Sequence, residues 1–151
     1  MLRDDINNAL KEAMKAKNQR AVSTLRLVNS ALKNADIEAR GAGKGPLSDD
    51  ELLAQLQKLI KQRQESAELY DKGGRPELAT QERDEIAVIT AFLPKQMSED
   101  EVKAAVAAAV KDIGASSMKD MGRVMAALKE RYAGKMDFAK AGGLVKGQLG
   151  S

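Results

Sequence analysis

Positively charged side chains in the last third of the chain are the residues whose type and spacing could do chemistry. From Gly114 onward there are seven Lys and Arg against three Asp and Glu, an excess of four positive charges, whereas the whole chain carries only +3. Ammonium and guanidinium groups bind phosphate oxygens, so this excess predicts a surface for a polyanion. The alternative is an ordinary solvated helix surface. The candidate phosphate contacts are Lys119, Arg123, Lys129, Lys135 and Lys140.

A second candidate set lies on the helix expected over residues 20–40. Arg26, Asn29 and Lys33 share one polar flank, beside the apolar stripe of Ala21, Leu25, Val28 and Leu32. These three polar side chains could hold phosphates as well. The alternative is a solvated helix back, and both interpretations stay open.

Arg63 is a charge in an apolar setting. It falls inside the apolar stripe of the helix expected over 48–72, and Glu82 and Glu85 fall on the inward stripe of the helix expected over 76–92. A charge on a buried face needs a partner. If the GGRP segment folds these helices into an antiparallel hairpin, Arg63 lies level with about residue 84. The sequence therefore predicts a structural ion pair rather than a catalytic group.

The sequence lacks the residues that catalysis, metal binding or cofactor binding would need. The chain has no Cys and no His, which removes thiolate catalysis, Zn–Cys sites and the commonest general base. The glycine-rich segment GAGKG lacks the ending and spacing of a phosphate-binding P-loop. We therefore expect no catalytic residue, no metal site and no cofactor. No apolar run approaches the roughly 20 residues of a membrane span, and the N-terminus is acidic, so we expect a cytoplasmic protein without a membrane partner.

Methionines are concentrated in the same C-terminal stretch as the cations. Met118, Met121 and Met125 recur at helical spacing with Leu128 and Tyr132, so we expect them in a core rather than in a binding groove. Gly122, at the edge of this stripe, is expected to allow close approach of a neighbouring helix.

Helices must position all of these residues, because apolar residues recur with helical periods throughout and no segment alternates like a strand. Ser48, Ser98 and Ser117 each precede an acid by three residues, which predicts capping boxes. Gly114 and Gly134 are expected as left-handed C-caps. We predict an all-α fold with a long hairpin in an N-terminal domain, 1–94, and a small three-helix domain, 95–151. The expected helices cover 2–17, 20–40, 48–72, 76–92, 98–113, 117–132 and a glycine-rich 137–149, which should fray unless packing holds it.

Five segments carry a resemblance over nearly the whole chain. They are STLRLVNSALKNADIE (23–38), LIKQRQESAELY (59–70), GGRPELATQERDEI (73–86), FLPKQMSEDE (92–101) and GASSMKDMGRVMAALKERYAGKMD (114–137). Together they resemble the YqeY-like family, whose C-terminal part is similar to the tail domain of the B subunit of the tRNA-dependent amidotransferase. The turn that reads GKADG-like in the family reads GKMDF here, with Met136 and Phe138 in place of small residues.

The resemblance implies an all-α protein. In the amidotransferase the tail domain helps to hold tRNA, while a separate domain of that enzyme does the chemistry. The leading hypothesis is a non-catalytic accessory module that binds tRNA or other RNA. The alternative is a helical protein–protein adaptor that docks on an aminoacyl-tRNA synthetase or an amidotransferase without RNA contact. The third choice is a carbon–nitrogen ligase with glutamine as amido-N-donor, for which the sequence shows no nucleophile or carboxyl-activating site.

Overall fold

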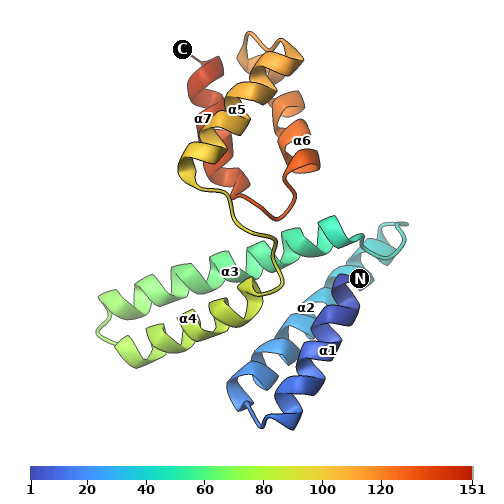
Figure 1. The fold of residues 1–151 in the computed structure, drawn as a ribbon, viewed down its shortest axis with the longest axis vertical. Helices are drawn as coiled ribbons and strands as arrows, with labels where there is room; N and C mark the ends of the chain where they lie inside the picture. The colour runs from blue at the N-terminus through green and yellow to red at the C-terminus, as the bar shows by residue number, and fades with distance from the viewer. Residues whose placement is uncertain (151) are drawn as a thin grey trace. The chain divides into compact units, whose positions relative to one another are not determined.

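The computed structural model describes residues 1–150 and is helical throughout, as predicted, with no strand in that range. Contacts within the chain divide it into an N-terminal unit, Met1–Leu93, and a C-terminal unit that begins at Pro94, one residue before the predicted boundary. The helices of the two units are shown in Figure 1. They are α1 (Leu2–Lys15), α2 (Gln19–Gly41), α3 (Asp49–Lys72), α4 (Pro76–Thr90), α5 (Glu99–Ile113), the 3₁₀ turn η1 (Met118–Asp120), α6 (Met121–Arg131) and α7 (Phe138–Leu149).

The N-terminal unit consists of two helical hairpins, α1–α2 and α3–α4, which pack on each other through α2. Its core is built from aliphatic side chains, among them the fully buried Ile6, Val28 and Leu56. A bidentate ion pair joins the first two helices, because both terminal nitrogens of Arg3 lie 2.7 Å from the carboxylate of Asp36. This pair lowers the pKa of Asp36.

The helix ends follow the predicted chemistry at most positions. Ser48 and Ser98 both form capping boxes, with the serine oxygen accepting from the backbone N–H three residues on and the glutamate returning a bond. Pro76 occupies the first turn of α4, where its missing N–H leaves no bond unmade. Gly114 ends α5 in the left-handed region at φ +69°, a conformation that a residue with a Cβ adopts at a cost.

The capping box predicted at Ser117 is wrong. The Ser117 side chain makes no cap hydrogen bond, and the chain runs through the short 3₁₀ turn η1 before α6 begins at Met121. Asp120 has turned instead toward the preceding segment, where its Oδ2 accepts from the Ser116 backbone N–H at 3.0 Å. That bond is the largest cause of the lowered pKa of Asp120. A tight turn therefore takes the place of a conventional helix start.

The core of the C-terminal unit corrects the prediction for the methionines. Val124 and Leu128 are the fully buried residues of α6, whereas Met121 and Met125 are half-buried at the edge of the core and Met118 is 41% exposed. The start of α6 at Met121, after a 3₁₀ turn of different pitch, rotates the buried face away from Met118. Met136, in the turn after α6, is buried instead.

The glycines of this unit also behave differently from expectation. Gly122 faces open space, and Gly142 on α7 is the glycine that lies against another helix, with the Met121 and Met125 methyl groups near its missing side chain. Gly134 has a positive φ of +73°, as expected. It lies in the turn beyond α6, however, and the C-cap of that helix is Tyr132. Packing holds the glycine-rich α7, because Ala141, Val145 and Leu149 are buried along one face.

Candidate functional site

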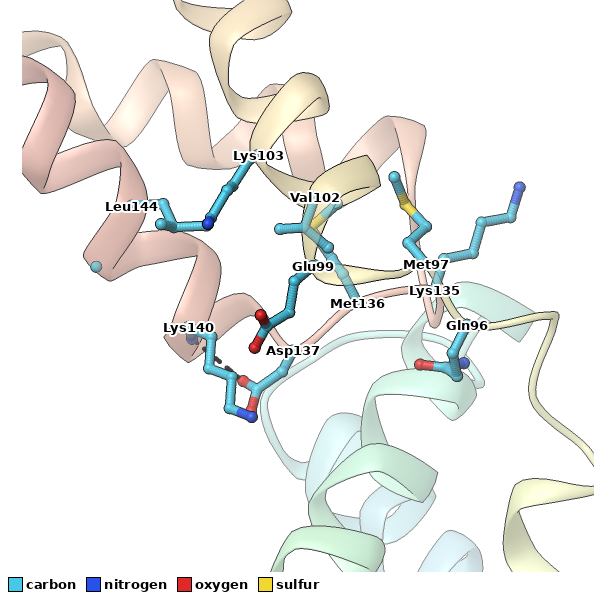
Figure 2. A pocket seen from close by; sticks show the side chains of 11 residues that line it. Gln96, Met97, Glu99, Val102, Lys103, Lys135, Met136, Asp137, Lys140 and Leu144 are labelled. Carbon is cyan, nitrogen blue, oxygen red and sulfur yellow. Dashed lines mark hydrogen bonds between the residues drawn. The ribbon is translucent and has the colours of Figure 1, made fainter.

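A groove with a volume of about 560 Å³ runs along the first turns of α5 and α7 in the C-terminal unit. Glu99, Val102 and Lys103 line it from α5, and Lys140 and Leu144 line it from α7 (Figure 2). The segments before these two helices, 96–97 and 135–137, complete its walls. The groove therefore joins parts of the sequence that lie about forty residues apart.

Two hydrogen bonds to backbone carbonyl oxygens hold the two segments of the wall together. The Met97 N–H donates to the Lys135 carbonyl oxygen at 2.9 Å, and the Gln96 side-chain amide donates to the Gly134 carbonyl oxygen at 2.7 Å. The positive φ of Gly134 turns the chain so that its carbonyl faces Gln96. The lysine at 135 is thereby fixed at the groove by its backbone, and only its side chain remains to move.

Three ammonium groups and two carboxylates border the groove: Lys103, Lys135 and Lys140 against Glu99 and Asp137. The carboxylate of Asp137 caps α7, with Oδ1 accepting from the Ala139 N–H at 2.9 Å and from the Lys140 N–H at 3.4 Å. Its charge is thus already directed at the N-terminus of that helix. The three ammonium groups then outnumber the one remaining carboxylate, that of Glu99, and this excess of positive charge favours an anion at the groove.

The side chains differ in direction, as Figure 2 shows. Lys103 extends from α5 toward Leu144 on α7, the Glu99 carboxylate points toward Lys140 and Asp137, and Lys135 extends away from both in this view. The floor between them is apolar and includes the buried Met136 with Val102 and Leu144. A ligand suited to such a groove carries a negative charge next to an apolar surface.

The structure divides the five predicted phosphate contacts into two groups. All five side chains are exposed, but only Lys135 and Lys140 line the groove. Lys119 lies on η1 and Lys129 near the end of α6, while Arg123 is paired with Asp120 at 2.9 Å. Lys103 was missed, because α5 carries four acidic residues against two lysines and was interpreted only as a core helix. The signal that could have found it is its position one turn into the helix that follows the PKQM segment.

The second candidate set is also only partly free to bind. Arg26 and Lys33 are exposed on α2, as expected. Asn29 is half-buried, and its side-chain amide donates to Oδ1 of Asn7 on α1 at 3.3 Å. Asn29 therefore connects the two helices of the first hairpin.

The third predicted set forms an ion pair between α3 and α4. Arg63 Nε lies 3.2 Å from Glu85 Oε2, and Arg63 Nη1 donates to the Leu59 carbonyl oxygen at 3.3 Å. Glu82 is next to this pair, and burial together with the charge of Glu85 raises its pKa. The cluster lies inside the hairpin and is a structural feature.

Within residues 1–150 no three acidic side chains gather closely enough to hold a metal ion, and the sequence contains no His or Cys that could join them. None of the helices in the same range combines the length and the apolar character that crossing a membrane requires.

Comparison with known proteins identifies the family. The family model described as "Yqey-like protein" matches residues 3–149, nearly the whole chain. The chain belongs to the YqeY-like family. A curated relative is the "Altered inheritance of mitochondria protein 41, mitochondrial" of Lachancea thermotolerans, which is 34% identical over 89 residues. That alignment covers 59% of this chain and 46% of the relative, so this member of the family spans just under half of the relative's length. The relative's name assigns it to mitochondria, and a cytoplasmic location for this chain stays a prediction.

Proposed function

We propose that this member of the YqeY-like family is a non-catalytic accessory module that binds RNA through its C-terminal unit, with tRNA as the RNA implied by its resemblance to the amidotransferase tail. The observation that carries the proposal is that Lys103, Lys135 and Lys140 all border one groove. RNA presents a phosphate at every nucleotide, and ammonium groups bind phosphate oxygens without regard to base sequence.

The mixed lining of the groove supports a nucleic acid over a simple inorganic anion. Beside the ammonium groups lies the apolar floor that includes Val102, Met136 and Leu144. A nucleotide combines a charged phosphate with the apolar face of a ribose or base, and so matches both parts of the lining. The N-terminal turn of α7 adds backbone dipoles that favour negative charge, although Asp137 already offsets part of this effect.

Lys119 and Arg123 supply a second, weaker part of the proposed interface. Both are exposed, but the ion pair with Asp120 neutralises part of the charge of Arg123. Since Asp120 also accepts from the Ser116 backbone, it is held in place and competes with any phosphate for Arg123. We therefore assign the larger share of binding to the groove lysines.

The adaptor function remains the alternative, and a salt titration distinguishes it. Binding of labelled tRNA to the purified protein is measured by fluorescence anisotropy at a series of salt concentrations. Phosphate contacts release counterions, so the proposal predicts that log K falls linearly with log salt, from a Kd of roughly 10⁻⁴–10⁻⁶ M near physiological salt. An absence of binding even at low salt would contradict the proposal and favour the adaptor.

A second measurement separates the two cationic groups. Reversing the charges of Lys119 and Arg123 together should lower tRNA affinity less than removing the charges of the three groove lysines. Both variants should keep the far-UV circular dichroism of the native protein, because all of these side chains are exposed. A larger effect from Lys119 and Arg123 would assign the interface to η1 and α6 instead.

A further inference from the structure

The solvent side of α2 carries one continuous stripe of exposed residues. Arg26, Ser30, Lys33, Ile37 and Arg40 follow one another at steps of four and three, which places them in a row along the helix, and each is exposed. We call this row the basic α2 stripe. From Arg26 to Arg40 it extends about 21 Å, the length over which a second helix could lie against it.

The charges of the stripe have one sign and a regular spacing. Arg26, Lys33 and Arg40 are each seven residues apart, and among residues 1–150 no carboxylate forms an ion pair with any of them. Of the acids of α2, Asp36 lies beside the stripe, where its charge also interacts with that of Arg40, but its carboxylate is held by the bidentate pair with Arg3. Glu38 lies nearly opposite Arg40 around the helix. A repeat of seven is the spacing at which charges on two packed helices face each other.

Large apolar side chains accompany these cations. Ile37, within the stripe, is 56% exposed, and Leu27 along its edge is 52% exposed. Beyond Arg26 lies a hollow of about 410 Å³, whose lining includes Met14, itself 52% exposed, and Val22. A phosphate backbone would leave these apolar groups in water, whereas a protein partner would cover them.

We infer that the basic α2 stripe binds an amphipathic α-helix of a partner protein, with acidic residues at seven-residue spacing and an apolar residue that enters the Met14–Val22 hollow. The acids would face Arg26, Lys33 and Arg40, and the apolar face of the partner would cover Ile37 and Leu27. This surface belongs to the N-terminal unit and goes beyond the proposed RNA binding, since neither depends on the other.

The test uses a designed peptide as the probe. It is a side-chain-stapled, monomeric helix of about 21 residues with Leu at the a and d positions and Glu at e and g. One control peptide has Gln in place of every Glu. A second keeps every Glu but has a central Pro that breaks the helix. Binding of each peptide to the full chain is measured by fluorescence anisotropy.

Two variants of the protein assign the binding to the stripe. The triple variant Arg26→Glu, Lys33→Glu, Arg40→Glu should bind the acidic helix about tenfold or more weakly. Ile37→Ser, which changes no charge, should weaken it about fivefold. The control variant Lys58→Glu, Lys61→Glu, Lys72→Glu makes the same change in net charge at exposed positions of α3 and should bind like the native protein.

Several results would overturn the inference. They are no binding of the acidic helix, equal binding of the Gln or Pro peptide, an unchanged affinity for Ile37→Ser, or the same loss in the α3 control. If the triple variant weakens tRNA binding while its affinity for the acidic helix stays native, the stripe contacts RNA and the inference is wrong. Far-UV circular dichroism of each variant checks that the helices are intact.

Discussion

Arg63 on α3 and Glu85 on α4 form an ion pair in the interior of the second hairpin, with Nε 3.2 Å from Oε2. Their side chains are only 14% and 11% exposed. The guanidinium also donates to the Leu59 carbonyl oxygen one turn earlier, so a second partner holds it in place. The pair therefore joins α3 to α4 inside the hairpin, at the height predicted from the sequence.

Replacing Arg63 by Ala should destabilise the α3–α4 hairpin by about 3 kcal/mol, because Glu85 would remain buried without its partner. Hydrogen exchange of the α3 and α4 amides measures this loss. The control is Arg83→Ala, which breaks an ion pair with Asp71 whose side chains are 53% and 44% exposed. That exposed pair should contribute much less to stability, because solvent screens the attraction and the two long side chains lose conformational entropy. Equal effects of the two substitutions would show that Arg63 is not a buried charge.

Glu82 should make the stability of the hairpin dependent on pH. Burial raises the pKa of Glu82 above its ordinary value of 4.5, and the charge of Glu85 raises it further. The folded protein therefore binds this proton more tightly than the unfolded chain. Ionisation of Glu82 therefore lowers the free energy of unfolding. This loss is absent below about pH 4.5 and grows as the pH rises through the raised pKa.

The substitution Glu82→Gln should accordingly increase the free energy of unfolding at neutral pH, and the gain should vanish at about pH 4. Urea denaturation at the two pH values measures the difference. Glu65→Gln, at an exposed position of α3, serves as the control and should show no such pH-dependent gain. A gain of the same size at both pH values would mean that ionisation of Glu82 is not the cause.

The two serines predicted as caps of the C-terminal unit should respond differently to substitution. Ser98 accepts from the Glu101 N–H at 3.2 Å, so Ser98→Ala should cost about 1 kcal/mol. Ser117 makes no cap hydrogen bond, and Ser117→Ala should change stability by less than about 0.5 kcal/mol. Thermal denaturation of the two variants provides the comparison. A larger loss for Ser117 would indicate that it caps η1 in solution.

Glycine substitutions test the last helix and its neighbour. Gly147 lies within α7 with open space where a side chain would extend, so Gly147→Ala should stabilise the C-terminal unit by about 0.5–1 kcal/mol. Gly114 also faces open space but has a φ of +69°, and Gly114→Ala should destabilise by about 1 kcal/mol. Chemical denaturation measures both. Destabilisation by Gly147→Ala would mean that α7 does not need a better helix former.

Much of the fold could be predicted from the sequence because its signals are local. Ser48 and Ser98 specify helix starts within four residues, Pro76 marks a first turn, and Gly114 ends α5. The Arg63–Glu85 pair could be predicted as well, because a short turn between two regular helices fixes which residues lie at the same height.

The candidate site could be predicted only in part, because it depends on how separate helices meet. Lys135 and Lys140 were found from local charge, but their position at one groove with Lys103 requires the bonds that join segment 96–97 to the turn at 134–135. The prediction for Met118 was wrong because a 3₁₀ turn changed the helical phase at its start. Periodicity alone does not reveal such a change of pitch.

The most direct test of the proposed function is the salt dependence of tRNA binding when the groove lysines lose their charge. The triple variant Lys103→Gln, Lys135→Gln, Lys140→Gln is compared with Lys58→Gln, Lys61→Gln, Lys72→Gln, which removes the same charge from exposed positions of α3. Each lost phosphate contact lowers the slope of log K against log salt by about 0.7–0.9, so the groove variant should lose about 2 units of slope and the α3 variant none. Equal slopes for the native protein and both variants would contradict RNA binding at the groove.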